Sequence, residues 1–319
     1  MHKRIIKTIA LVALLAVSVG CGTEKKSESA KATIKIGVLS TADSLPLYVA
    51  DQENLFTGNG CNVEVVEFGS ASDQSKAMEA GELDGMMTDM VVQCLLKKGG
   101  VNLKAVTVAL GSEVTEGKFY VASSSNSDVD EIGELEGSKI AVSEGTMMEF
   151  LVDSYCDELG IDKESIEKVN VPSLSLRYEM LMEGNDIDCA ILPEPLADYA
   201  VKNGAKAVID DTKLQNNYST SVIVLNDELI KNQPEMVGNF MKAYTAAVQK
   251  LTSNPEEFKE LALDVANVPE DMKESYETPH YTAGILPSEA AVERVVKWML
   301  DKELLTEAYS YESLVSTDF

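Results

Sequence analysis

The sequence predicts an α/β protein of two lobes, each a mostly parallel sheet flanked by helices. Two observations support this fold class. Strand-like and helix-like segments alternate along most of the 319 residues, which is typical of parallel sheets with helices on both faces. In addition, a helix end, a glycine, an acidic residue and an apolar strand occur in this order at 78–84 and again at 182–188, which indicates two similar units.

The first unit opens with a strand at 33–39, in which polar and apolar residues alternate before the run turns apolar. Its helices stop at glycines, because Gly81 and Gly99 follow two of the predicted helix ends. The other predicted strands are 62–68, 83–87 and 102–109, and the predicted helices are 44–55, 72–80 and 90–98.

The second unit repeats this alternation, and a glycine again follows each predicted helix. The segment 146–159 places its apolar side chains on one face, as a helix packed on a sheet does. The predicted strands are 138–142, 166–171 and 187–192, and the predicted helices are 146–159, 174–183 and 196–203.

The last third of the chain is predicted to be helical. Its helices, 235–251, 256–265 and 289–302, follow proline or serine residues that favour helix starts. Their apolar stripes indicate helices packed on a preformed body, and we interpret Trp298 as a packing residue.

Residues 1–20 are predicted to be a signal peptide. A basic start precedes the apolar run Thr8–Val19, whose 12 residues are too few to span a bilayer at about 1.5 Å per residue. The residues up to Cys21 resemble a bacterial lipobox, with Ser18 where leucine is usual, and the resemblance implies a fatty acid such as palmitate on Cys21. The alternative is an ordinary signal peptide with an accidental cysteine. Residues 21–32 are polar and suit a flexible tether, so we expect the protein at the cell membrane, lipid-anchored and facing the extracytoplasmic side.

The charge balance excludes one class of partner. The chain has 27 basic and 53 acidic residues and a net charge of −26 at pH 7. It therefore lacks the basic stripe that neutralises phosphates, so no nucleic acid partner is expected. The same charge argues against electrostatic adhesion to anionic lipid.

The cysteines and histidines form no pattern for metal or nucleophilic chemistry. Cys61, Cys94, Cys156 and Cys189 contain no C-x-x-C pair, so we expect no metal and no cofactor. We interpret these cysteines as buried thiols, and the alternative is one disulfide in an exported protein. His280, the one histidine outside the signal peptide, is interpreted as a surface or packing residue rather than a catalyst.

Several stretches resemble one family, in the order in which the family has them. They are SLPLYVADQENLF (44–56) with GCNVEVVEFGSASDQSKAMEAGELD (60–84), GELEGSKIAVSEGTMMEFLV (133–152), ILPEPLADYAVKNGAKAV (191–208) and NQPEMVGNFMKAYTAAVQKLTSNPEEF (232–258). These stretches are similar to ABC transporter substrate-binding lipoproteins of the nitrate, sulfonate, taurine and thiamine-pyrimidine-precursor binding group. The resemblance extends over nearly all of residues 33–300.

The resemblance implies the two-lobed type II periplasmic-binding-protein fold, with a ligand cleft between the lobes. Residues 33–118 and 224–319 would form lobe I, and residues 119–223 would form lobe II. Two crossing strands, 118–123 and 219–226, would join the lobes and act as the hinge. The alternation agrees with this, because open α/β sheets bind ligands at the carboxyl ends of their strands.

The candidate ligand-binding residues follow predicted strands or begin predicted helices. Backbone N–H groups at helix starts carry partial positive charge, and Glu194 is expected to accept hydrogen bonds from a ligand N–H. The alternative for the hydroxyl and acidic residues is a purely structural role as helix caps. The candidates are Ser40, Thr41, Asp43, Ser70, Thr88, Asp89, Glu144, Gly145, Thr146 and Glu194, with Ser44, Gly69, Ser72 and Ser143 beside them.

The candidate loops offer hydroxyls, backbone N–H groups and carboxylates, but no fixed cation. Arg177 and Arg294 lie in predicted helices, so a guanidinium clamp on an anion is not expected unless Arg177 reaches the cleft. We therefore favour a small neutral or NH-rich heterocycle, such as a thiamine-pyrimidine-like compound. Nitrate, sulfonate or taurine comes second, held by backbone N–H groups at Gly145 and Thr146.

The expected function is capture of this solute and its delivery to ABC permease subunits by a monomeric lipoprotein, without enzymatic activity. One alternative is a sensory lipoprotein that uses the same fold to bind a signal molecule. A second is a pyrimidine-synthase-like enzyme. Enzymes of that kind resemble catalysts with an active-site histidine and a cysteine-rich motif, and this sequence matches neither.

Overall fold

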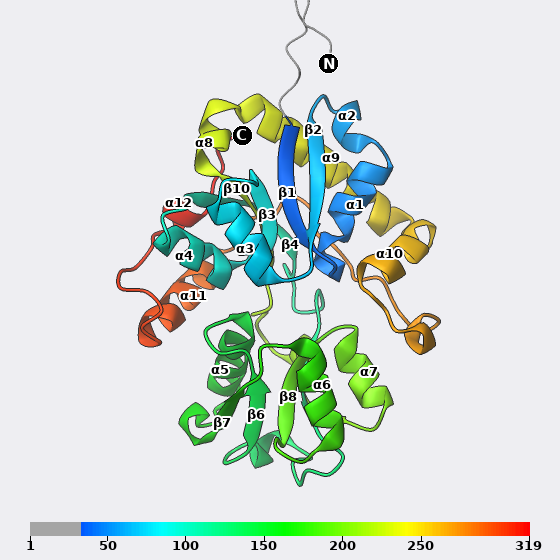
Figure 1. The fold of residues 1–319 in the computed structure, drawn as a ribbon, viewed down its shortest axis with the longest axis vertical. Coiled ribbons are helices and arrows are strands. Elements are labelled where there is room, and N and C mark those ends of the chain that lie inside the picture. The colour runs from blue at the N-terminus through cyan, green and yellow to red at the C-terminus, as the bar shows by residue number, and fades with distance from the viewer. Residues whose placement is uncertain (1–32) are drawn as a thin grey trace, which may run out of the picture. The chain divides into compact units, whose positions relative to one another are not determined.

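Two mixed five-stranded sheets organise residues 33–319, the part of the chain that the computed structural model describes (Figure 1). The signal peptide, the tether and Cys21 lie outside the described residues. In each sheet one strand runs against the other four, so the predicted fold class is confirmed. The first sheet has the order β2 (Asn62–Phe68), β1 (Thr33–Leu39), β3 (Gly85–Asp89), β10 (Ser221–Asn226), β4 (Leu103–Leu110). The second has the order β7 (Glu167–Asn170), β6 (Lys139–Val142), β8 (Cys189–Pro193), β5 (Phe119–Ser123), β9 (Lys206–Asp210).

The helices agree with the predicted ranges in most places and differ from them in a few. The helices at 90–98 and 174–183 are found with the predicted bounds, whereas the predicted helix 44–55 is interrupted at Asn54, which is in the left-handed region at φ 55°. The strand β9 and the helices α8 and α12 were not predicted. The helices are α1 (Leu45–Gln52), α2 (Leu55–Gly58), α3 (Ala71–Glu79), α4 (Met90–Lys98), α5 (Met147–Leu159), α6 (Leu174–Glu183), α7 (Leu196–Lys202), α8 (Asp227–Asn232), α9 (Pro234–Ser253), α10 (Lys259–Val265), α11 (Glu289–Asp301) and α12 (Tyr311–Leu314).

The two sheets repeat the same topology, as the recurring sequence pattern indicated. The strands that correspond in order are β2 and β7, β1 and β6, and β3 and β8. The aspartate at the last position of each pattern, 84 or 188, makes the same contact. The Asp84 carboxylate accepts a hydrogen bond from the backbone N–H of Lys35 at 2.8 Å, and the Asp188 carboxylate accepts one from that of Lys139 at 2.8 Å. This repeat allows equivalent positions of the two sheets to be compared.

The two segments predicted to cross between lobes lie inside the sheets instead. β5 pairs with β8 and β9 in the second sheet, and β10 pairs with β3 and β4 in the first. The chain passes between the sheets just before these strands, at 111–118 and 211–220. The Glu116 carboxylate, almost fully buried on the first passage, accepts hydrogen bonds from the hydroxyls of Ser112 and Thr282. The predicted lobe boundaries stay a prediction.

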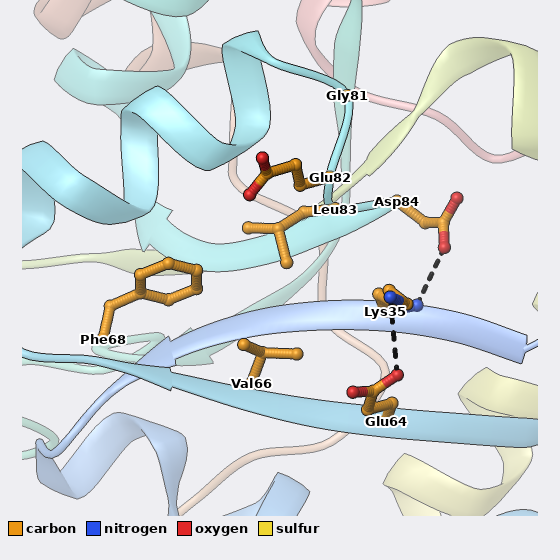
Figure 2. A pocket seen from close by; sticks show the side chains of 8 residues that line it. All are labelled: Lys35, Glu64, Val66, Phe68, Gly81, Glu82, Leu83 and Asp84. Carbon is orange, nitrogen blue, oxygen red and sulfur yellow. Dashed lines mark hydrogen bonds and ion pairs between the residues drawn. The ribbon is translucent and has the colours of Figure 1, made fainter. Parts of the chain in front are cut away.

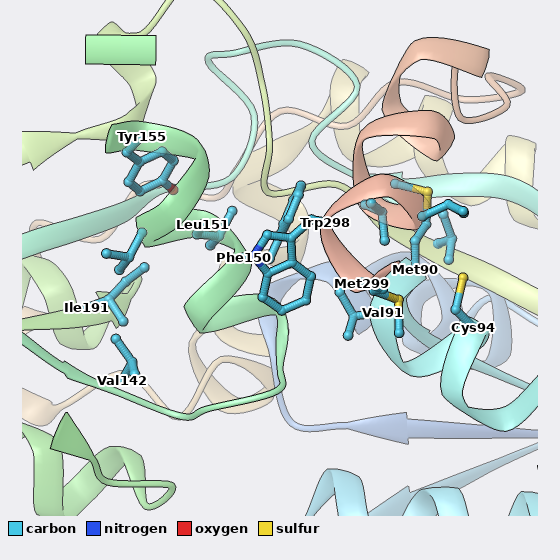
Figure 3. Close-up of a cluster of buried hydrophobic side chains, with 14 of the residues drawn as sticks. Met90, Val91, Cys94, Val142, Phe150, Leu151, Tyr155, Ile191, Trp298 and Met299 are labelled. Atoms are coloured by element: carbon cyan, nitrogen blue, oxygen red, sulfur yellow. The ribbon is translucent and has the colours of Figure 1, made fainter. Parts of the chain in front are cut away.

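A hydrophobic cluster connects α4, α5 and α11 (Figure 3). Met90 on α4, Phe150 on α5 and Met299 on α11 belong to it, and the cluster continues into both sheets. The Trp298 ring packs edge-on against Phe150 with ring centroids 5.5 Å apart, so its packing role is confirmed. The four cysteines of the described chain are buried, as interpreted from the sequence.

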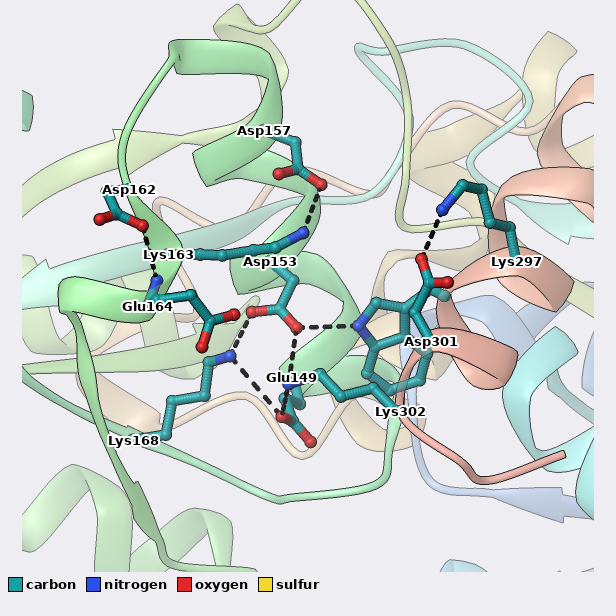
Figure 4. A network of polar contacts seen from close by, with 11 residues as sticks. Glu149, Asp153, Asp157, Asp162, Lys163, Glu164, Lys168, Lys297, Asp301 and Lys302 are labelled. Carbon is teal, nitrogen blue, oxygen red and sulfur yellow. Dashed lines mark hydrogen bonds and ion pairs between the residues drawn. The ribbon is translucent and has the colours of Figure 1, made fainter.

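A buried polar network lies beside this cluster (Figure 4). The Asp153 carboxylate is about 1% exposed and accepts a hydrogen bond from the Trp298 indole N–H at 2.8 Å. Lys168 on β7 and Lys302, directly after α11, both form ion pairs with Asp153 and Glu149. Burial alone would raise the pKa of Asp153, but hydrogen bonds from Lys168 and Trp298 and the charges of the two lysines hold it below its usual value. Helix α11 is therefore fixed to α5 by charge as well as by packing.

Candidate functional site

The carboxyl edge of the first sheet gathers two candidate carboxylates. Asp43 lies in the short turn after β1, and Asp89 ends β3, which is paired with β1. Within residues 33–319 neither carboxylate has a Lys, Arg or His partner. Burial raises the pKa of both carboxyls, and the negative charge of Asp43 adds to the rise at Asp89. This edge therefore presents two desolvated carboxyl groups that have no cationic partner in the described part of the chain.

Buried hydroxyls surround these carboxylates. Ser221, the first residue of β10, pairs across the sheet with Asp89, and its hydroxyl lies close enough to Asp43 to oppose the pKa rise there. The hydroxyls of Ser44 and Tyr244 are buried and have no hydrogen-bond partner in the described part of the chain. Burial and then the charge of Asp43 raise the pKa of Tyr244, so this side chain also belongs to the edge. Because buried polar atoms are nearly always paired, these two hydroxyls favour a site that a polar ligand completes.

The carboxyl edge of the second sheet carries Glu194 with a partner that sequence analysis missed. Lys118, directly before β5, places its Nζ 3.8 Å from Glu194 Oε2 and 2.6 Å from Asp198 Oδ2. The expectation of no fixed cation at the candidate loops is therefore wrong. Lys118 directly precedes β5, and Glu194 directly follows β8. The two residues are neighbours because β5 and β8 pair in the sheet, and the sequence alone does not show this pairing. Glu194 Oε2 nevertheless has no hydrogen bond within residues 33–319.

The Glu194 carboxyl is close to its titration midpoint at neutral pH. Burial raises its pKa to about 7, Lys118 opposes the rise, and the charge of Asp198 adds to it. Burial and then the charge of Glu194 raise the pKa of Tyr276, which lies in the loop after the short turn Glu270–Met272 and packs with the core of the first sheet. Glu194 therefore lies where residues from the two sheets approach one another.

The start of α5 differs from the expectation. Thr146 is the N-cap, and its hydroxyl accepts a hydrogen bond from the Met148 N–H at 3.2 Å. The Gly145 N–H, expected to hold an anion, donates instead to the Glu149 carboxylate at 2.8 Å. The Glu144 N–H donates to the Asn170 side chain at 3.2 Å, and the Glu144 side chain is exposed. Because the protein fills this helix start with its own carboxylate, the backbone site for an anion loses its support.

The remaining candidates have structural partners. Ser70 is the N-cap of α3 and Asp89 that of α4, with Asp89 Oδ1 accepting from the Val91 and Val92 N–H groups at 2.8 and 2.9 Å. The Ser40 hydroxyl donates to Glu67 at 2.6 Å, and the Thr41 hydroxyl donates to Asp43 at 2.5 Å. Thr88 was expected just after a strand, but it lies inside β3 and is buried, because β3 begins and ends two residues later than predicted.

Two pockets lie away from these edges. One, with a volume of about 500 Å³, is bordered by Lys35, Glu64, Phe68 and Asp84 beside β1 and β2 (Figure 2). The other, of about 270 Å³, lies between the end of α9 and residues 280–283. Neither pocket is lined by a candidate residue, and the unpaired polar groups lie at the sheet edges instead. Within residues 33–319, no three His, Cys, Asp or Glu residues gather in a way that could hold a metal ion, and no helix is long and apolar enough to cross a membrane.

Comparison with protein families gives one match over most of the chain. The model of the NMT1-like family matches residues 27–266. A protein of Brachyspira hyodysenteriae named as an ABC transporter periplasmic binding protein is 26% identical over 269 residues, which cover 79% of this chain and 75% of that one. A 4-amino-5-hydroxymethyl-2-methylpyrimidine phosphate synthase of Saccharomyces cerevisiae is 23% identical, with 70% of this chain and 68% of that one covered.

The fold itself is similar to solved structures. The periplasmic aliphatic sulphonate binding protein SsuA from Escherichia coli superposes with a TM-score of 0.76 at 15% sequence identity. The superposition covers 90% of this chain and 92% of that protein. At this identity the likeness shows the periplasmic-binding-protein fold and leaves the ligand open.

Proposed function

This chain belongs to the NMT1-like family, and from that premise we propose that it captures a small solute outside the cytoplasm and delivers it to an ABC importer. Two findings support the proposal. One relative that matches most of the chain is named as an ABC transporter periplasmic binding protein. The fold is that of periplasmic binding proteins, in which the carboxyl edges of two sheets hold the ligand.

The proposed solute is a small NH-rich heterocycle of the thiamine-pyrimidine kind, with nitrate, sulfonate or taurine second. The observation that carries this proposal is the set of desolvated carboxyl groups at the sheet edges. Asp43 and Asp89 lie on one edge and have no cationic partner in the described chain, and Glu194 lies on the other and has one buried oxygen without a hydrogen bond. Such oxygens accept hydrogen bonds from ligand N–H groups, and a charge-assisted hydrogen bond is about twice as strong as a neutral one. A relative named as a pyrimidine phosphate synthase supports the same ligand class.

The same relative makes an enzyme the second candidate function. The described chain has a single histidine, His280, whose Nδ1 lies 3.2 Å from the buried Glu116 carboxylate on the passage between the sheets. The His280 ring contacts no candidate ligand-binding residue, so the described sheet edges have no imidazole that could act as a general base. We therefore propose a binding protein rather than a catalyst.

The test is native mass spectrometry of the full chain purified from membranes in a mild detergent. We expect a co-purifying organic compound that contains ring nitrogen and N–H groups. An inorganic anion or a simple sulfonate in its place would contradict the proposed solute class and keep the binding role. Turnover of the released compound on incubation would favour the enzyme.

Anchoring is part of the proposal and has its own test. We propose that a fatty acid is attached to Cys21 and holds the mature protein at the membrane. Metabolic labelling with a radioactive fatty acid should mark the wild type and leave Cys21→Ser unlabelled. Equal labelling of both proteins would remove the anchor from the proposal.

A further inference from the structure

Arg177 is a buried cation without a counter-charge. It lies on α6, is 1% exposed, and is the largest fully buried side chain of the described protein. One of its terminal nitrogens donates to the Ile191 carbonyl at 2.9 Å. Its Nε has no hydrogen-bond partner within residues 33–319, and no carboxylate there forms an ion pair with it.

A buried charge without a counter-charge lowers the stability of the folded protein. Moving an ionised group from water to a protein interior carries a large penalty that a counter-charge normally offsets. Burial lowers the pKa of Arg177 to about 10, so the side chain still carries its charge at neutral pH. The interior of the second sheet therefore holds a positive charge that the described protein does not neutralise.

The first sheet provides an internal comparison for this position. Gln74 is the fourth residue after the N-cap Ser70 of α3, and Arg177 is the fourth residue after the N-cap Ser173 of α6. The Gln74 amide donates to the Met87 carbonyl at 3.0 Å. Met87 is the third residue of β3, as Ile191 is the third residue of β8. A neutral amide thus makes the equivalent contact, so the fold does not require the charge of Arg177.

The guanidinium lies on the carboxyl side of the point where β6 and β8 stop pairing. β6 and β8 pair only at Ile140 with Cys189 and at Ala141 with Ala190, so the carbonyl of Ile191 lies beyond the paired region. Arg177 donates to this carbonyl, and Ile191 lies three residues before Glu194. Open α/β sheets bind ligands at such carboxyl ends.

We propose that Arg177 binds an anionic group of the solute, a carboxylate, sulfonate or phosphate, through its unpaired Nε and the neighbouring terminal nitrogen. A guanidinium presents parallel N–H groups that match two oxygens of such an anion. This inference rests on the proposed function and adds a second recognition element to it. The solute then carries N–H groups for the carboxylates and an anionic group for Arg177, while Glu149 keeps the start of α5 closed to anions.

The test measures anion binding to the full chain, purified in a non-ionic detergent. Phosphate, sulfate, ethanesulfonate and acetate are titrated against chloride at constant ionic strength, with thermal unfolding and calorimetry as readouts. At least one of these anions should stabilise the wild type saturably. Arg177→Gln should weaken that binding about 10- to 150-fold, the factor for loss of a hydrogen bond to a charged group. Because glutamine already occupies the equivalent position in the first sheet, this variant should fold.

Two variants serve as controls. Arg294, the other arginine of the described chain, is on α11 and lies over the Tyr218 ring. Arg294→Gln removes the same charge as Arg177→Gln and should leave the anion affinity unchanged. Arg177→Lys keeps the charge and loses the paired N–H groups, so it should bind the anion more weakly than the wild type. If Arg177→Gln does not fold, the anion affinity of Arg177→Lys tests the proposal instead.

The proposal is overturned if none of the four anions stabilises the wild type, or if the Arg177 variants bind them as tightly as the wild type does. Titration with the uncharged alcohol 4-amino-5-hydroxymethyl-2-methylpyrimidine separates this outcome from failure of the proposed solute class. If the alcohol binds and no anion does, the anion-binding role of Arg177 is contradicted and the proposed solute class is kept. If Arg177→Gln loses anion binding and the wild type does not bind the alcohol, the heterocycle is contradicted as the solute and the role of Arg177 is kept.

Discussion

Glu194 is a buried carboxyl group that lies beside a cation without forming a hydrogen bond to it. Its carboxylate is close to Lys118, yet the separation of 3.8 Å is too long for a hydrogen bond, and Lys118 bonds to Asp198 instead. One carboxylate oxygen is therefore buried without a partner. Leaving a buried acceptor unpaired costs about 1–3 kcal/mol, so a ligand donor that pairs with it recovers that free energy.

Replacing Glu194 by glutamine should weaken binding of the natural solute about 10- to 150-fold, since a hydrogen bond to a charged acceptor is lost. Calorimetric titration with the compound that mass spectrometry identifies measures the change. Glu144→Gln is the matched control, because Glu144 is an exposed candidate carboxylate and its loss should change affinity little. Tight binding by Glu194→Gln would make Glu194 a structural residue.

The raised pKa of Glu194 also predicts a pH dependence. Its value in the folded protein is about 7 and its ordinary value is 4.5, so between these values the folded chain holds the proton more tightly than the unfolded chain. The stability that this group contributes is fully present below pH 4.5 and is lost as the pH rises through 7. Urea unfolding should therefore show a larger fall in the free energy of unfolding from pH 5 to pH 8 for the wild type than for Glu194→Gln. Equal falls would contradict the pKa.

At the scale of elements, α5 and α11 are joined by two kinds of contact. The apolar faces of the helices pack through Phe150 and Trp298, while Asp153 and Glu149 meet the lysines beside them. Helix α5 follows a strand of the second sheet, and α11 packs on α4, which follows a strand of the first. This contact therefore connects elements that belong to different sheets.

Two lysines, one within α11 and one directly after it, allow the stability that the buried ion pairs contribute to be measured. Lys302→Met removes one of two cations from the buried Glu149 and Asp153, so it should lower the free energy of unfolding by about 2–3 kcal/mol, less than a full buried pair because Lys168 stays. Lys297→Met removes the exposed pair with Asp301 and should cost no more than about 1 kcal/mol. Urea denaturation of both variants tests this difference, and equal costs would mean that the buried network adds no stability.

For the whole molecule, the passages at 111–118 and 211–220 connect the two sheets covalently, and the proposed hinge motion would take place there. Contacts on two sides oppose this motion: the network of α5 and α11, and the exposed pair of Lys202 on α7 with Asp271, 3.4 Å apart. The Asn267 amide and the Tyr281 hydroxyl also tie the loop beside Asp271 to the first sheet. Motion at the passages would therefore separate α7 from this loop.

Solute binding should bring the sheet edges together by rotation at the two passages. Small-angle X-ray scattering of the mature protein should show a smaller radius of gyration when the identified solute is saturating. Glu194→Gln at the same solute concentration should compact less, because less of it is bound. An unchanged radius of gyration at saturation would contradict a hinge.

By itself the sequence determined the α/β class, the two similar units and most of the helices and strands, because periodicity, glycine stops and capping residues are local properties. The helix 90–98 shows this, since its apolar face, its two final lysines and Gly99 all lie within one short stretch. The strand β9 was missed because it pairs with β5, a strand more than 80 residues earlier, and its first two residues are exposed.

Only the tertiary structure decided which candidate groups are unpaired, because a side chain's partners come from distant segments. The Gly145 N–H was expected to bind an anion, but it donates to the Glu149 carboxylate. Glu194 lies beside Lys118 because β5 pairs with β8. The burial of Arg177 at the opening between β6 and β8 depends in the same way on where those strands stop pairing. Charge pairing in the interior follows from the order of the strands, which local sequence does not encode.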